Sequence, residues 1–300
     1  MKLLGRYING NTKTTIFSDG TRIRETEADE FVPAFADNMD IKITDACDMG
    51  CLACHEGSTL NGKHADILNE KFIDTLHPFQ EVAIGGGDAT SHPDLIPFLE
   101  KLREKKVIAN MTVNQRHFEQ KQDLIRKLIE EKLIWGLGVS LVAPTPEFIS
   151  LVKQYPNAVI HVINGLFTED ELDKLQDHGL KILILGYKRL RRGERFYQDK
   201  EYYIAANMEM LKGRLGDMIS RFNVVSFDNL AITQLGVQNM LSPEDWERFY
   251  AGDDGTHTYY IDMVNRKFAQ SSTAPFDERY DLLDSVDEMF DVITRRKAAA

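Results

Sequence analysis

Short apolar segments alternate with longer amphipathic ones through the middle of the chain, from about residue 40 to residue 228. The predicted strands are residues 40–44, 81–84, 109–113, 136–141, 159–163, 181–185 and 223–227. The predicted helices are residues 70–77, 93–105, 118–133, 146–154, 169–178 and 202–220. Such alternation predicts an α/β fold with a parallel sheet and helices outside it. Six strand–helix units and one further strand favour a partial (β/α)6 TIM-like barrel.

The two ends of the chain lack this alternation. Residues 6–9, 14–18 and 22–25 read as strands joined at the turn signals Asn9-Gly10 and Asp19-Gly20. After residue 228 we predict a helix at 243–250, a hairpin of 256–263 with 267–271, and a helix at 282–296. The predicted organisation is an N-terminal β extension (1–39), the barrel (40–228) and a small C-terminal α+β extension (229–300) packed on it.

Charge and hydropathy exclude some classes of protein. The formal net charge of the 300 residues is −11, which disfavours nucleic acid as a partner because duplex binding needs a cationic surface. We find no run of about 18 apolar residues that would span a membrane. The first residues are too polar for a secretory signal, so we expect a cytoplasmic protein.

The chain has three cysteines, Cys47, Cys51 and Cys54, within eight residues. An odd, clustered set is a poor disulfide framework and a good set of metal ligands. The set follows the first barrel strand, at the end where parallel-sheet enzymes place their chemistry. Three thiolates would leave one iron of a [4Fe–4S] cluster open. A Cys3His zinc site with His55 is the alternative, although adjacent Cys54 and His55 make tetrahedral ligation awkward.

Polar and small residues stand at the ends of the later strands. Gly86 and Gly87 would let the backbone approach a ligand closely, and Asp88 could accept a hydrogen bond from an ammonium group. Further candidate binding residues at strand ends are Asn114, Ser140, Asn164 and Gly186. Lys188 begins a run of five cations in eight residues, which is either a solvated loop or a site for an anionic group.

The C-x3-C-x2-C motif after the first strand, with the glycine-rich end of the second, resembles the radical S-adenosylmethionine (SAM) superfamily. The resemblance implies a [4Fe–4S] cluster held by Cys47, Cys51 and Cys54, with SAM on the open iron. Reductive cleavage of SAM would give a 5′-deoxyadenosyl radical that abstracts hydrogen from a substrate. It also implies an external one-electron donor of the flavodoxin or ferredoxin type. The implied cofactor-binding residues are Gly86, Gly87, Asp88, Asn114, Ser140, Asn164, Gly186 and Lys188.

The substrate is predicted from the tail that follows the barrel. Its hairpin resembles a cysteine-free version of the domain that carries auxiliary clusters in peptide-modifying members, so we favour a peptide or protein side chain. The alternatives are a radical SAM enzyme acting on a small molecule or nucleotide, and a non-catalytic zinc- or SAM-binding regulator. No residue stands out as catalytic, and Tyr187 is a candidate hydrogen donor. We expect His161 in the core or facing a helix, and Asp228 and Asn229 near the substrate.

Overall fold

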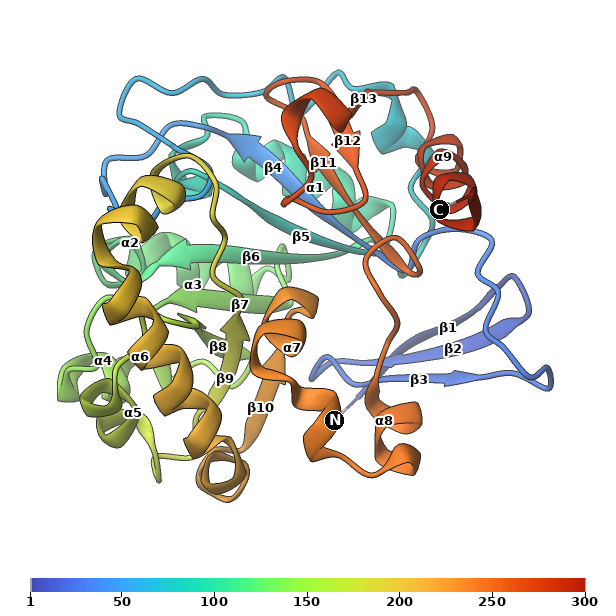
Figure 1. Cartoon of the computed structure of the whole chain (residues 1–300). Helices are drawn as coiled ribbons and strands as arrows, with labels where there is room; N and C mark the ends of the chain where they lie inside the picture. The colour runs from blue at the N-terminus through green and yellow to red at the C-terminus, as the bar shows by residue number, and fades with distance from the viewer. Residues whose placement is uncertain (1, 300) are drawn as a thin grey trace.

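The computed structural model describes residues 2–299, with side chains for residues 2–296, and places a large, mostly parallel sheet at the centre (Figure 1). The strands of this sheet are β4 (Asn38–Thr44), β5 (Glu81–Gly86), β6 (Ile108–Asn114), β7 (Gly136–Ser140), β8 (Ala158–Ile163), β9 (Lys181–Leu185), β10 (Val224–Phe227), β11 (Thr258–Asp262), β12 (Lys267–Ala269) and β13 (Tyr280–Asp281). All seven predicted barrel strands are therefore confirmed, and their ends differ from the prediction by no more than two residues.

The sheet order is β10-β9-β8-β7-β6-β5-β4-β11-β12-β13. Strands β4 to β10 are parallel to one another, and β11 is parallel to β4. The last two strands are antiparallel additions. In the described part of the chain the sheet does not close on itself. The mixed α/β class with a large, mostly parallel sheet is confirmed, and the partial barrel stays a prediction.

Each parallel strand presents two different faces. In β4 the side chains of Met39, Ile41 and Ile43 are buried and belong to the main hydrophobic core, which includes residues of the covering helices. The residues between them, among them Asp40 and Lys42, lie on the opposite face because side chains alternate along a strand. We call this opposite, more polar face the inner face.

The helices of the parallel region are α1 (Leu95–Glu104), α2 (Gln115–Gln120), α3 (Gln122–Glu130), α4 (Pro146–Val152), α5 (Glu169–Leu175) and α6 (Arg192–Arg221). Three predictions were wrong in detail. Residues 70–77 form only a 3₁₀ helix, η1 (Lys71–Thr75), and the predicted helix 118–133 is broken at Lys121. Helix α6 begins ten residues before the predicted start, because its charged first turns show no apolar periodicity.

The sequence predicts a capping box of Thr168 with Glu171 at the start of α5 and a cap by Gly179 at its end. The capping box of Thr168 with Glu171 is confirmed at its start. The predicted glycine cap at its end is wrong, since the helix ends at Leu175 and Gln176 is already extended. Gly179 has a positive φ of 68° further along, in the turn that leads to β9.

The C-terminal segment contributes more than a covering layer. The predicted hairpin forms, but its first strand, β11, joins the large sheet beside β4, and residues Tyr259 to Met263 are buried there. The segment also contains α7 (Asn229–Leu235), which was not predicted, together with α8 (Pro243–Phe249) and α9 (Val286–Ala299). In residues 2–299 no helix combines the length and the apolar character needed to cross a membrane.

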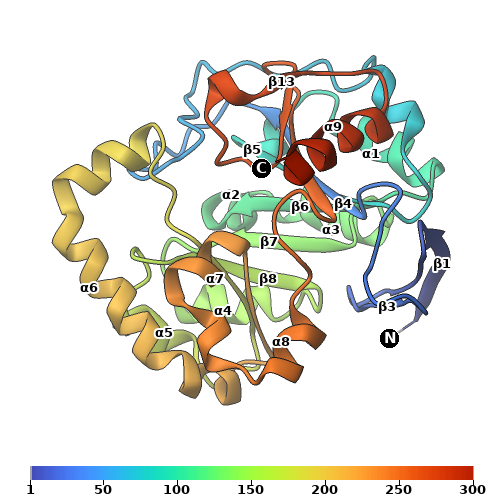
Figure 2. The same ribbon diagram turned by 45° about the vertical axis from the view of Figure 1, so that its right-hand side comes forward.

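The N-terminal strands β1 (Leu3–Asn9), β2 (Thr12–Phe17) and β3 (Arg22–Glu25) form a separate antiparallel sheet, as predicted. Figure 2 shows it on the side of the molecule away from α6. Buried Asp37, just before β4, ties this sheet to the parallel region. Its carboxylate lies 2.7 Å from Arg24 Nε and accepts a hydrogen bond of 2.9 Å from Asn9, while Arg22 reaches both Asp37 and Glu81.

Replacing Asp37 with Asn should destabilise the fold by about 3 kcal/mol at pH 7, because half-buried Arg24 loses its counter-charge and Arg22 keeps only Glu81. Burial alone would raise the pKa of Asp37, but Arg22 and Arg24 outweigh it and hold the pKa below its usual value. The stability that Asp37 contributes is therefore present above the unfolded pKa of about 3.9 and is lost as pH falls through the lower folded value.

Denaturant unfolding at pH 7, 4 and 3 checks this expectation. The difference between wild type and Asp37→Asn should persist to pH 4 and shrink at pH 3. Glu25→Gln is the matched control, because the Lys13–Glu25 pair in the same sheet is exposed and should contribute less than about 1 kcal/mol. A difference that grows toward pH 3 would contradict the assignment.

Candidate functional site

The three cysteines lie on the loop that leaves the carboxyl end of β4. Cys51 is exposed, whereas Cys47 and Cys54 are half-buried. Residues 59–65, which we call the returning segment, run back along the end of β4 and hold the loop in place. Cys47 N donates to Thr59 O at 2.8 Å, and Thr59 N donates to Asp45 O at 3.1 Å. These hydrogen bonds fix the backbone of the loop, and all three thiols lie at the edge of the sheet formed by the carboxyl ends of the parallel strands. We refer to residues 45–58 as the cysteine loop.

The thiols are electrostatic neighbours. Partial desolvation raises the pKa of Cys47 and of Cys51, and the charge of the next thiol, Cys51 or Cys54 respectively, raises it further. Arg192 and Arg116 oppose this effect at Cys51. Among the described residues, no three His, Cys, Asp or Glu side chains converge closely enough to hold a single metal ion.

The glycines at the end of β5 are explained by contact with the start of the cysteine loop. A Cβ atom on Gly86 would collide with the carbonyl oxygen of Thr44, and one on Gly87 with that of Ala46. Gly87 N donates to Thr44 O, and Asp88 N donates to Ala46 O, both at 2.7 Å. The close approach predicted from the sequence is therefore present, but it brings β5 against the chain itself. In contrast, a Cβ on Gly85 would meet open space.

Asp88 is buried and has partners within the chain. Lys121 Nζ lies 2.7 Å from its Oδ2, the amide of Thr90 donates to its Oδ1, and the ring of His117 lies 3.4 Å away. A bound ammonium group would have to share this carboxylate with Lys121. The predicted role of Asp88 toward SAM stays a prediction.

The other predicted residues stand at the carboxyl ends of their strands, in varied environments. Asn114 caps α2 by accepting a hydrogen bond from Arg116 N, and Gly186 packs against Leu230, which leaves no room for a side chain. Ser140 is half-buried at the end of β7. Asn164 is fully buried and donates to Gln234, but its Oδ1 has no hydrogen-bond partner among the described residues.

The cationic run after β9 contacts the cysteine loop. Arg192 Nε donates to Cys51 O at 3.0 Å and its Nη1 to Ser58 O at 2.9 Å, while Arg191 donates to Glu56 O. Figure 1 shows the start of α6 beside the segment that follows β4. The interpretation of the whole run as a solvated loop is therefore wrong, because two of its arginines hold the cysteine loop.

Lys188, the first cation of the run, points elsewhere. Its Nζ donates to Ser272 Oγ at 3.0 Å, and its charge acts on both Asp40 and His55. The hydroxyl of Tyr187, guessed above to be a hydrogen donor, donates to Gly193 O at 2.8 Å. Lys188 thus remains the cation of this run that lies toward the inner face.

Two titratable residues of the inner face have strongly shifted pKa values. Desolvation raises the pKa of Asp40 to about 6, Asp254 and Asp228 act in the same direction, and Lys188 opposes them. Desolvation lowers the pKa of His161 to about 4, so its ring is neutral at pH 7. Of the two positions expected for His161, the helix-facing one is wrong, because the buried residues of β8 are its neighbours and its own ring lies over Gly138.

Asp228 and Asn229 were predicted near the substrate, and both have structural partners here. Asp228 caps α7 through Ala231 N and also accepts from Gly186 N. Asn229 donates to Asp254 Oδ1 at 2.7 Å, which links α7 to the segment before β11.

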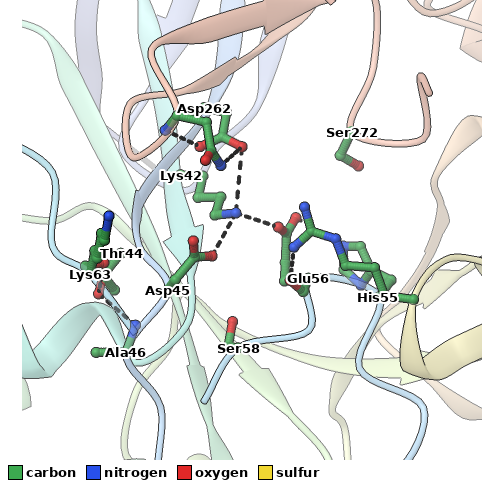
Figure 3. Close-up of polar contacts among 12 residues, drawn as sticks. Lys42, Thr44, Asp45, Ala46, His55, Glu56, Ser58, Lys63, Asp262 and Ser272 are labelled. Carbon is green, nitrogen blue, oxygen red and sulfur yellow. Dashed lines mark hydrogen bonds and ion pairs between the residues drawn. The ribbon is translucent and has the colours of Figure 1, made fainter. Parts of the chain in front are cut away.

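Lys42 was not predicted as a site residue. Its side chain is 1% exposed, and its ammonium lies among the carboxylates of Asp45, Glu56 and Asp262 (Figure 3). Glu56 also lies 3.3 Å from His55 Nε2. The only sequence signal was a lysine in a strand whose neighbours are apolar, which is equally typical of a strand with one solvated face.

These elements define an open, mostly parallel α/β sheet with a thiol-bearing loop at the carboxyl end of one central strand. No protein-family model matches the chain, and no curated protein matches it.

Solved structures of SuiB from Streptococcus suis are similar in fold. SuiB bound to the precursor peptide SuiA gives a TM-score of 0.55 at 17% sequence identity, covering 87% of this chain and 65% of SuiB. SuiB bound to S-adenosylmethionine gives a TM-score of 0.56 at 16% identity, covering 87% and 66%. The chain thus matches slightly less than two thirds of the length of SuiB, and the likeness shows a shared fold.

Replacing Arg192 with Ala should loosen the cysteine loop, because the carbonyls of Cys51 and Ser58 lose a charged donor. Two hydrogen bonds of this kind contribute about 1–2 kcal/mol together, so amide exchange across residues 47–58 should rise about tenfold. Hydrogen–deuterium exchange of the metal-free, reduced protein measures this. Arg189→Ala is the control, since Arg189 contacts Glu194 and the ring of Tyr197 at the surface, away from the loop, and its loss should leave the loop unchanged.

Proposed function

We propose that this protein is a radical SAM enzyme that acts on a peptide or protein side chain. The single observation that carries the proposal is the position of Cys47, Cys51 and Cys54 at the carboxyl end of a central strand in this sheet. The fold it shares with SuiB, which has been solved with S-adenosylmethionine and with a precursor peptide, supports it.

The donor set fits a [4Fe–4S] cluster. Thiolates are the usual ligands of such clusters, and each binds a different iron atom, so the three sulfur atoms need not converge on one point. The loop that carries Cys47, Cys51 and Cys54 is anchored along its length by Thr59 and Arg192. Cys51 is exposed, which leaves that edge accessible to an external electron donor of the flavodoxin or ferredoxin type.

With the cluster bound, SAM would supply a 5′-deoxyadenosyl radical to the inner face. The chain's own part is to bind and orient SAM and to exclude water. The open space at Gly85 and the unpartnered Oδ1 of buried Asn164 offer room and an acceptor at two strand ends. Ser140 lies at the end of β7, and Lys188 lies after the end of β9. The other residues of the proposed SAM-binding set are Gly86, Gly87, Asp88, Asn114 and Gly186.

The choice of a peptide substrate rests on two features. SuiB is a protein of similar fold that has been solved with a precursor peptide. In this chain two of the five cations of the run, Arg191 and Arg192, are engaged with the cysteine loop, and Arg189 pairs with Glu194, which weakens the case for a phosphate-bearing nucleotide.

Anaerobic reconstitution with iron and sulfide, followed by reduction in the presence of SAM, tests the proposal. We expect a brown protein that releases 5′-deoxyadenosine, and we expect Cys51→Ala to lower this release at least a hundredfold because one iron loses its ligand. Cys51→Ser is a second variant with a similar shape and a weaker ligand. A colourless protein that holds zinc and leaves SAM unchanged would refute the proposal.

Lys188→Ala should weaken binding of SAM or of substrate by about tenfold while the iron content stays that of the wild type. The reason is that Lys188 is the cation directed to the inner face, where it would pair with a carboxylate. Equilibrium binding of SAM to the reconstituted protein measures the effect. Arg189→Ala, from the same run but at the surface, is the matched control; equal affinities in all three proteins would contradict the role.

A further inference from the structure

We propose that Lys42 is a positioning residue that fixes the cysteine loop against β11, so that the C-terminal segment is an integral part of the site. The inference rests on the proposed function only in that the loop would hold a [4Fe–4S] cluster. The connection between the loop and β11 is independent of it.

Both ends of the cysteine loop meet at the ammonium group of Lys42. Its Nζ lies 2.6 Å from Asp45 Oδ1 and 2.9 Å from Glu56 Oε2 (Figure 3). Asp45 stands two residues before Cys47, and Glu56 stands two residues after Cys54. One buried cation therefore contacts residues on both sides of the cysteine motif.

The third carboxylate on Lys42 comes from the other end of the chain. Asp262, at the end of β11, is fully buried, and its Oδ2 lies 3.4 Å from Lys42 Nζ. The two residues are paired in register between β4 and β11, so their side chains lie on the same face of the sheet. More than 200 residues of sequence separate Lys42 from Asp262, and the ion pair connects them directly.

Two further residues of the C-terminal segment extend the network. Arg279 Nη1 lies 3.4 Å from Asp262 Oδ2, and its guanidinium lies 5.1 Å from the ring of Tyr260. The Tyr260 hydroxyl in turn donates to Glu56 Oε1 at 3.4 Å. The cysteine loop is thus attached to β11 by two routes, through Lys42 and through Tyr260.

The charges of this network are interdependent. Two cations, Lys42 and Arg279, face three carboxylates in a region where water is largely excluded. Loss of Lys42 would leave Asp45 and Glu56 without their shared cation, and loss of Asp262 would leave the buried guanidinium of Arg279 without its carboxylate. Apolar residues of the same volume often give equal or greater stability than a buried ion network, so stability alone is a weak account of this one. Directional contacts do account for it, because they fix the position of Asp45 and Glu56 and hence of the thiols between them.

The decisive experiment is hydrogen–deuterium exchange of the metal-free protein carrying Asp262→Asn. We expect exchange across residues 45–58 to rise at least fivefold, although the substitution lies in β11. Asp281→Asn is the matched control, since Asp281 pairs with Lys267 on the same hairpin but is 89% exposed, and it should leave the loop unchanged. Faster exchange confined to β11 and β12 would overturn the proposal.

The second measurement is the iron content of the reconstituted variants. After reconstitution we expect Glu56→Gln and Asp262→Asn to retain less than half of the wild-type iron, with an altered electron paramagnetic resonance line shape of the reduced cluster. Lys42→Arg, which keeps the charge, should retain more iron than Lys42→Met. Wild-type iron content and line shape in both acid variants would overturn the proposal.

The outcomes separate the two proposals. If the wild-type protein binds no iron–sulfur cluster, the proposed function fails, while the exchange experiment still decides whether Lys42 couples the loop to β11. If Lys42→Met does not fold, the two acid variants, which keep the cation, carry the test.

Discussion

The carboxyl end of β4 is the point on which the site depends. Its backbone carbonyls at Thr44 and Ala46 bind the amides of Gly87 and Asp88, and the returning segment binds Asp45 and Cys47. A short stretch of chain therefore has three neighbours at once: β5, the returning segment and, through Lys42, β11. Because each contact is a hydrogen bond or a buried ion pair, the geometry of the thiols is set by direction as well as by packing.

Features that depend on neighbouring residues in the sequence could be predicted, and features that depend on distant residues could not. Strands and helices have local periodicity, and the cysteines share one loop, so the α/β class and the thiol site could be predicted from sequence. Lys42 could not, because its meaning depends on Asp262, more than 200 residues away. The start of α6 at Arg192 was missed for a different reason, since its first turns are stabilised by contacts with the cysteine loop and lack an apolar face.

The glycines at the end of β5 were correctly predicted to allow a close backbone approach, but the group that approaches them was not. The sequence indicated a close backbone approach at Gly86 and Gly87, and the approach exists, but the partners are the backbone carbonyls of Thr44 and Ala46. A glycine-rich strand end reports only that something comes near. Gly85, whose missing side chain faces open space, is the position in this segment that leaves room for a ligand.

The C-terminal segment shows how a site can be completed without further metal ligands. It carries no cysteine, yet it places Asp262, Tyr260 and Arg279 beside the residues that flank the thiols. Since β11 extends the parallel sheet next to β4, its carboxyl end falls at the same edge as the loop. Strand order alone thus brings the two ends of the chain to one place, and the buried charges make that proximity specific.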